Sequence, residues 1–471
     1  MQKAAPPGHF PWLLAGVFSS LRQDYPLSLL SPLFSPALPN TTDQTIKPWQ
    51  PLIRYNAVTC RYSEIGTKGH NRNFFVRHLC EALDRRLSYA FGRPRFVTEK
   101  GRLFMFPEEK GSDLTALQLQ ALRKEIPELP GLSSVSPGWM MEPTMEGLRQ
   151  YVSENFKAIY AAFAAAVPPE QRTYAMRVNR VDKSFPMRSE AIEREFAAQI
   201  LPAHPDLRLD LKEPMLRLEV DLRRERIFIC CERIPGPGGL PTGSAGKVLA
   251  MLSGGFDSPV ACYELMRRGC EVDFVTFHSS PYTPPATVTK VCRLTCKLNE
   301  YQKRGRLVAV NLLPYQKAVR DLCDERLRTV LYRRAMLRVA TVVARYFGDL
   351  ALASGDNLGQ VASQTLENMG VINAAAEMMI LRPLLTFDKL DIMAVADKIG
   401  TSSLSIEDVP DSCTVFAPRS PTTHAILEEV VAEEAKLDIR GLVRECLRGT
   451  VIINPRTYVE HPFTELLECY G

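Results

Sequence analysis

The sequence predicts an α/β protein whose C-terminal half forms a doubly wound parallel sheet and whose N-terminal half holds two smaller α+β modules. Three observations support this prediction. Continuous apolar strands alternate with helices from Lys247 onward, a pattern typical of a parallel sheet covered on both faces. The clearest linker, rich in proline and glycine, covers residues 235–243. Ahead of it, strand and helix patterns form two compact groups.

The first module is predicted over residues 52–137. Its expected elements are a strand at 53–58, a helix with Phe75, Leu79 and Leu83 on one stripe, a strand at 102–106 and an amphipathic segment at 114–122. The second module is predicted over residues 138–235. Its expected elements are helices at 145–166 and 189–200 and strands at 173–178, 216–221 and 226–231.

After a linker at 236–246, the third module is predicted over residues 247–430, with a tail at 431–471. Its expected strands cover 247–252, 271–278, 306–312 and 349–354, and its expected helices cover 259–268, 286–303 and 325–347. Residues 1–51 contain repeated Pro-Leu and Ser-Pro steps and are expected to form an irregular extension without a signal peptide.

The composition bounds the class of protein. The chain has 471 residues, 45% of them hydrophobic and 24% charged, which suits a soluble protein of two or three domains. No apolar run reaches the roughly 18 residues of a membrane helix. The net charge of +5 permits nucleic-acid binding without demonstrating it, and twelve cysteines without regular spacing indicate free thiols and a cytoplasmic location.

A glycine-containing loop, Ser253-Gly254-Gly255-Phe256-Asp257-Ser258, follows the first strand of the third module. Proline opens the helix after it, so backbone N–H groups would face an anion such as a phosphate. The two glycines permit close approach, the serines can donate hydroxyl protons, and Asp257 suits Mg²⁺ on a pyrophosphate. The alternative is an ordinary strand-to-helix turn that is rich in glycine.

The loop lacks the Lys-Ser/Thr pair of common phosphate loops and resembles the pyrophosphate loop of ATP pyrophosphatases. The order of several motifs is similar to that of the tRNA 4-thiouridine synthases, also called ThiI proteins. These motifs are residues 62–72, 177–180, 354–366, 382–384 and 388–389. The resemblance implies a ferredoxin-like domain, a THUMP RNA-binding domain and an ATP pyrophosphatase domain, in the short form without a C-terminal rhodanese domain.

The resemblance also implies the residues that would bind Mg·ATP. They are Met251, Leu252, Ser253, Gly254, Gly255, Ser258, Thr276, Phe277, Arg333, Gly355 and Gln364. Asp257 would hold Mg²⁺ and Lys389 would stabilise phosphoryl charge. Taken singly, Phe277 would be a core residue, and Arg333 and Lys389 would be solvated side chains.

Cys413 is implied as the carrier of sulfur, because uracil O4 becomes a leaving group once it carries AMP and a sulfur nucleophile can then displace it. The predicted product is 4-thiouridine, by resemblance at uridine 8, and sulfur transfer for thiamine thiazole synthesis is a further implied role. An alternative is an iron–sulfur thiolase using Cys292 and Cys296 with Cys413. Another is a non-catalytic RNA-binding protein that is regulated by a nucleotide.

Basic residues in the first two modules are the candidates for RNA contact. They are Lys68, Arg72, Arg177, Arg180 and Lys183. Such side chains can follow phosphates in a salt-dependent way, although basic runs are often only solvated faces. The expected partners are tRNA, a cysteine desulfurase as sulfur donor and a sulfur-carrier protein of thiamine synthesis, and no membrane partner is expected.

Overall fold

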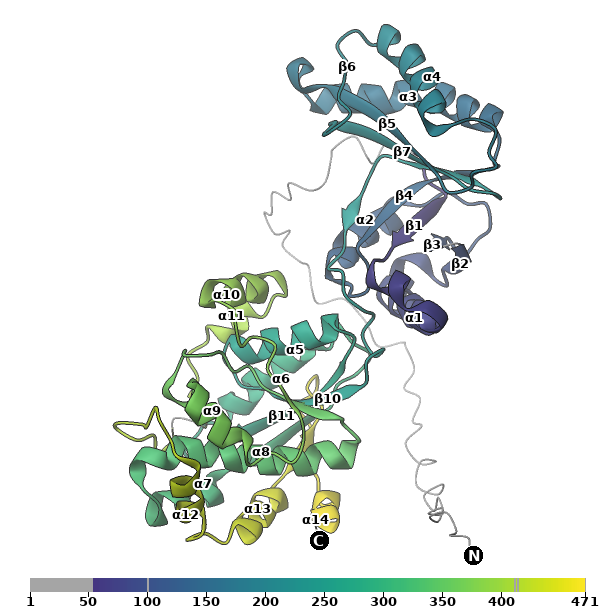
Figure 1. The fold of residues 1–471 in the computed structure, drawn as a ribbon. Coiled ribbons are helices and arrows are strands. Elements are labelled where there is room, and N and C mark those ends of the chain that lie inside the picture. The colour runs from purple at the N-terminus through teal and green to yellow at the C-terminus, as the bar shows by residue number, and fades with distance from the viewer. Residues whose placement is uncertain (1–53, 100, 411, 413–414, 471) are drawn as a thin grey trace, which may run out of the picture. The chain divides into compact units, whose positions relative to one another are not determined.

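A computed structural model describes residues 54–99, 101–410, 412 and 415–470 (Figure 1). The N-terminal elements build one nine-stranded sheet in the order β2-β3-β1-β4-β8-β7-β5-β6, with β9 paired to β4. Its strands are β1 (Ala57–Arg61), β2 (Arg95–Glu99), β3 (Arg102–Phe106), β4 (Ser134–Met141), β5 (Thr173–Arg180), β6 (Arg208–Leu209), β7 (Leu216–Leu222), β8 (Ile227–Cys230) and β9 (Ile234–Pro235).

Four helices accompany this sheet: α1 (Arg72–Phe91), α2 (Ala116–Glu125), α3 (Met145–Ala166) and α4 (Ser189–Ala203). Their apolar stripes share one core with the strands, as the burial of Leu79, Leu122, Phe163 and Phe196 shows. The α+β character predicted for both modules is therefore present. The expected first strand is displaced and begins at Ala57, and residue 53 lies outside the described residues.

The C-terminal half forms a seven-stranded sheet in the order β14-β13-β10-β11-β12-β15-β16. Its strands are β10 (Lys247–Met251), β11 (Glu271–His278), β12 (Leu307–Asn311), β13 (Ala351–Ala353), β14 (Ile380–Leu381), β15 (Val451–Ile453) and β16 (Glu460–Pro462). Strands β10 to β14 are parallel to one another. The chain starts at β10, runs outward to β12 and then returns to β13 on the other side, as in a doubly wound sheet.

Helices cover both faces of this sheet, with α5 and α8 on opposite sides in Figure 1. They are α5 (Asp257–Arg267), α6 (Ala286–Leu298), α7 (Leu313–Leu322), α8 (Arg328–Phe347), α9 (Leu366–Asn373), α10 (Lys389–Lys398), α11 (Ser402–Ser405), α12 (Leu427–Glu434), α13 (Ile439–Arg448) and α14 (Glu465–Tyr470). Alternate strand residues enter two cores, Leu249 and Val275 on one face and Val248 and Phe274 on the other.

Two differences from the sequence prediction have a physical cause. Residues 431–471, predicted as a tail, include α13 and α14 and the antiparallel strands β15 and β16, and β15 pairs with the edge of β12. Three-residue strands carry too little periodicity to be read from sequence. The helix predicted at 286–303 ends at Leu298, because Asn299 turns the chain through a hydrogen bond from the Gly305 amide (2.7 Å).

Candidate active site

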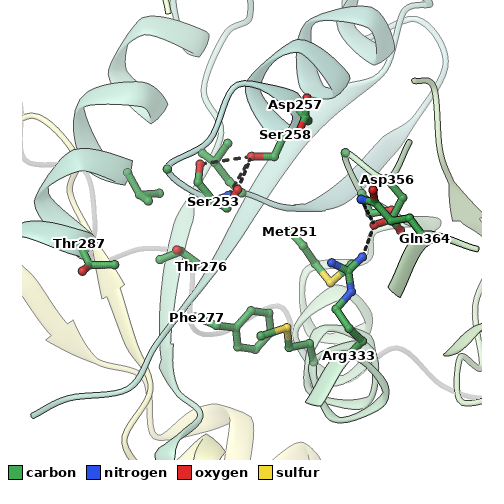
Figure 2. Close-up of a pocket in the computed structure, with 16 residues that line it drawn as sticks. Met251, Ser253, Asp257, Ser258, Thr276, Phe277, Thr287, Arg333, Asp356 and Gln364 are labelled. Atoms are coloured by element: carbon green, nitrogen blue, oxygen red, sulfur yellow. Dashed lines mark hydrogen bonds and ion pairs between the residues drawn. The ribbon is translucent and has the colours of Figure 1, made fainter. Parts of the chain in front are cut away.

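A cavity opens at the carboxyl ends of β10, β11 and β13, where the sheet order reverses (Figure 2). Doubly wound sheets bind ligands at this position because the loops after neighbouring strands diverge there. The cavity is lined by Met251, Leu252, Ser253, Gly254, Asp257, Ser258, Thr276, Phe277, Thr287, Val291, Arg333, Met336, Ser354, Gly355, Asp356 and Gln364. Every nucleotide contact predicted from the sequence is among them except Gly255.

The loop after β10 is held closed by its two serines. The Ser253 amide donates to the Ser258 hydroxyl (2.9 Å), and the two hydroxyl groups lie 3.1 Å apart. Gly355, which follows β13, packs against the backbone where this loop enters α5: a Cβ atom on Gly355 would lie 2.7 Å from the Ser258 nitrogen. The loop conformation therefore depends on a glycine from a strand far away in the sequence.

Gly355→Ala is expected to displace the loop and to weaken nucleotide binding at least about tenfold, because the added methyl would overlap backbone atoms that cannot move aside freely. Gly370→Ala is the matched control, since Gly370 lies within α9, away from the cavity lining, and its Cβ would meet nothing within 4 Å. Calorimetric titration of both variants with a non-hydrolysable ATP analogue checks this. Equal affinities would show that the contact at Gly355 does not set the loop.

Asp257 and Lys389, both predicted to act in catalysis, contact each other at the edge of the cavity. The Lys389 ammonium lies 2.8 Å from one carboxylate oxygen of Asp257, and the Gln360 amide donates to the other at 3.1 Å. Asp257 begins α5 and Lys389 begins α10, so two helix N-termini converge here. Both side chains are partly exposed, 23% and 44%, and remain accessible to a ligand.

Asp356 is a site residue that the sequence interpretation did not single out. Its buried carboxylate accepts hydrogen bonds from Arg333, from the Ser354 hydroxyl (2.7 Å) and from Arg382 (3.2 Å). Burial opposes ionisation, but the guanidinium of Arg333 and the Ser354 hydroxyl together lower the pKa of Asp356 to about 2. Asp356 is thus ionised at neutral pH and fixes Arg333 on the cavity wall (Figure 2). The sequence signal that could have identified Asp356 as a site residue is its position within the motif at 354–366.

Comparison with known proteins decides the family. Three family profiles match the chain in order: the ThiI ferredoxin-like domain at residues 57–136, the THUMP domain at 152–232, and the thiamine biosynthesis protein (ThiI) at 243–439. A probable tRNA sulfurtransferase of Halothermothrix orenii is 35% identical over 406 residues, which are 85% of this chain and 98% of that protein. The chain belongs to the tRNA sulfurtransferase family.

Further relatives agree with this assignment. A probable tRNA sulfurtransferase of Lysinibacillus sphaericus is 36% identical over 421 residues, 88% of this chain and 100% of that protein. The crystal structure of a 4-thiouridine synthetase–RNA complex with bound ATP matches with a TM-score of 0.72 and 31% identity, over 85% of this chain and 100% of that chain. The resemblance and the fold class predicted from the sequence are confirmed.

Within the tRNA sulfurtransferase family, Cys413 is the predicted sulfur carrier, and it lies outside the described residues. Its described neighbours are anchored to the α/β unit. The Pro410 carbonyl accepts a hydrogen bond from the hydroxyl of Thr287, a residue of the cavity wall (2.9 Å). Buried Ser412 shares a hydrogen bond with the Ser279 hydroxyl (2.7 Å), and its carbonyl accepts one from Gln316 (2.9 Å).

Cys292 and Cys296, which would be ligands in the alternative of an iron–sulfur thiolase, lie one turn apart on α6. Burial, with a smaller effect from Cys296, raises the pKa of the Cys292 thiol to about 12, so it is protonated at neutral pH. In the part of the chain that the structure describes, no three His, Cys, Asp or Glu side chains are grouped to hold a metal ion. Neither Cys292 nor Cys296 forms a disulfide.

The predicted RNA contacts lie in the first two modules, in two sets. Arg72 donates to the Gly66 carbonyl (2.7 Å), and Lys68 lies 5.1 Å from the ring centroid of Phe75. In the second set, Arg180 donates to the carbonyls of Phe185 and Met187 (3.3 and 3.2 Å) and closes the loop after β5.

The remaining two members of the second set differ in their surroundings. Lys183, in the same loop as Phe185, is exposed, whereas Arg177 lines a cavity of mixed charge with Arg217 and Glu219. Arg180, by contrast, stabilises its own loop through the two hydrogen bonds described above, in addition to carrying a charge.

Among the described residues, no helix is both long and apolar enough to cross a bilayer.

Proposed function

We propose that this chain transfers sulfur to tRNA in an ATP-dependent reaction that forms 4-thiouridine at uridine 8 through an adenylated uracil. The observation that carries the proposal is the cavity at the sheet switch point, which joins the closed glycine loop to the contact of Asp257 with Lys389. Support comes from the family and from the similar structure, a 4-thiouridine synthetase–RNA complex with bound ATP.

In the activation step, the glycine loop and the N-terminus of α5 hold the phosphates of ATP through backbone N–H groups. Adenosine lies against Met251, Thr276 and Phe277, whose side chains line the inner wall (Figure 2). Uracil O4 attacks the α-phosphorus, the bond to the bridging oxygen breaks, pyrophosphate leaves, and the N3 proton of the uracil passes to solvent. Lys389 offsets the negative charge that develops on the phosphates.

Asp257 suits Mg²⁺ carried by ATP, because a single accessible carboxylate beside a phosphate loop matches the way Mg²⁺ keeps several water ligands. Bound there, Mg²⁺ would supply charge neutralisation on the leaving pyrophosphate. The Lys389 ammonium contacts one oxygen of Asp257 and thereby offsets the charge of the carboxylate at the cavity edge.

In the transfer step, the terminal sulfur of a Cys413 persulfide attacks C4 of the adenylated uracil, and AMP leaves. A thiol reductant then attacks the Cys413 sulfur, which breaks the S–S bond and leaves one sulfur on C4. A second thiol equivalent restores Cys413, so two thiols become one disulfide. A cysteine desulfurase would form the persulfide again from cysteine.

The first two modules supply RNA contact in this proposal. Positively charged side chains in these modules would bind the phosphates of folded tRNA with little contact to base edges. They are Lys68, Arg72, Arg177, Arg180 and Lys183. The match to the THUMP domain and the RNA in the similar structure support this role.

The proposal also includes a cytoplasmic location and a sulfur-carrier partner for thiamine thiazole synthesis. The name of the matching family, thiamine biosynthesis protein, supports this partner.

The test is to incubate the purified full chain with Mg·ATP, a cysteine desulfurase, cysteine, a thiol reductant and unmodified tRNA. We expect pyrophosphate release that requires tRNA, and 4-thiouridine in the digested nucleosides by mass spectrometry. Nucleotide binding without pyrophosphate release would favour the non-catalytic RNA-binding alternative. Iron and inorganic sulfide in anaerobically purified protein, with activity that depends on them, would favour the cluster alternative.

A further inference from the structure

A second cavity, of about 450 Å³, lies across the glycine loop from the nucleotide cavity. It is lined by Gly254, Gly255, Thr287, Lys290, Ser405, Ile406, Glu407, Asp408, Val409 and Pro410. Gly254 and Thr287 line both cavities, so the loop and the start of α6 form a shared wall. The resemblance implies no ligand for this second cavity. Gly255, which does not line the nucleotide cavity, lines the second cavity.

The walls of this second cavity are tied together by hydrogen bonds. Lys290 is only 5% exposed, and its ammonium donates to the carbonyls of Ser405 (3.1 Å) and Glu407 (2.7 Å). The Ser405 hydroxyl donates to the Gly255 carbonyl (3.2 Å), which fixes the segment 405–410 against the glycine loop. The cavity is therefore built into the fold rather than left by loosely packed side chains.

The chemistry of the lining favours an uncharged, flat ligand. Glu407 is ion-paired with Arg293 (2.6 Å), and Asp408 accompanies the buried ammonium of Lys290, so the charges around the cavity balance and suit an uncharged ligand. Ile406 is 67% exposed and offers an apolar surface on which a planar ring can lie. Carboxylate oxygens can accept the N3–H proton of a uracil ring.

We infer that the second cavity receives the acceptor uracil of the RNA, flipped out of its stack, and this inference rests on the proposed function. The uracil would then face the nucleotide cavity across Gly254, which lines both cavities and whose Cβ, if present, would lie 3.1 Å from the Lys290 side chain. The opposite wall, residues 405–410, ends three positions before Cys413. One base could thus meet ATP on one side and sulfur on the other.

The first test is Ile406→Glu, which adds charge and removes apolar contact at an exposed position that the fold does not need. We expect tRNA-dependent pyrophosphate release to fall about tenfold or more in kcat, with the affinities for ATP and tRNA unchanged within about twofold. Ile406→Val should retain activity. Leu350→Glu is the matched control, because Leu350 is also exposed but lines neither cavity, and it should behave as wild type.

The second test uses tRNA that already carries 4-thiouridine, a base that cross-links to its contacts under near-ultraviolet light. Mass spectrometry of the irradiated complex should locate the cross-link within residues 405–410 or at Lys290. Cross-links found only in the nucleotide cavity or the first two modules would overturn the inference, as would wild-type kcat in Ile406→Glu. If the wild-type chain releases no pyrophosphate with tRNA, the proposed function itself fails.

Discussion

Replacing Asp257 with alanine is expected to lower tRNA-dependent pyrophosphate release at least about a thousandfold, which corresponds to about 4 kcal/mol of transition-state stabilisation. The carboxylate would be lost from the point where the glycine loop meets Lys389. Folding should not be affected, because the pair is partly exposed and such pairs contribute about 1 kcal/mol or less to stability. Pyrophosphate release and filter binding of tRNA, measured side by side, check this.

The binding of tRNA should be unchanged in Asp257→Ala, since the predicted RNA contacts lie in the first two modules. Asp391→Ala is the matched control, because Asp391 is an exposed carboxylate on α10, the helix that Lys389 begins. It should keep wild-type activity. Pyrophosphate release by Asp257→Ala at the wild-type rate would remove Asp257 from the mechanism.

Replacing Cys413 with serine is expected to separate activation from sulfur transfer. Pyrophosphate release should stay within about threefold of wild type, since the glycine loop and its contacts are retained. Formation of 4-thiouridine should fall at least about a thousandfold, because a serine hydroxyl cannot carry a persulfide. Nucleoside mass spectrometry measures the product, and the mass of the Cys413 peptide in the wild-type chain should increase by one sulfur atom.

Cys296→Ser is the matched control for this experiment, because Cys296 is a partly buried thiol in the same α/β unit. It should thiolate tRNA as wild type does. If Cys413→Ser still forms 4-thiouridine at the wild-type rate, sulfur transfer through Cys413 is wrong. Loss of thiolation in Cys296→Ser would instead direct attention to the iron–sulfur alternative.

Much of the fold could be predicted because its signals are local. The long helices α3 and α8 and the buried strands β10 and β11 have periodic apolar patterns over many residues. The glycine loop is likewise a contiguous motif whose role follows from a strand before it and a helix after it. The prediction failed at β15 and β16, because strands of three residues acquire their stability from the edge of β12 rather than from their own pattern.

Contacts between distant residues could not be predicted in the same way. Asp356 meets Arg333 and Arg382 because β13 returns beside β10 after the chain has visited β12, an order of strands that no short motif encodes. Lys290 would be taken for a solvated lysine on a helix, yet it is buried because the end of α11 and the segment after it bring the carbonyls of Ser405 and Glu407 to its ammonium. Pairing across long sequence separation decides such contacts.

The sequence by itself therefore determined the family, the order of the three modules and the residues proposed to bind ATP, since these depend on motifs and periodic patterns within short segments. Only the tertiary structure decided that Gly355 supports the glycine loop, that Asp356 fixes Arg333, and that a second cavity adjoins the first. The physical reason is that a cavity is the space between packed elements. Its walls exist only once the sheet order has brought those elements together.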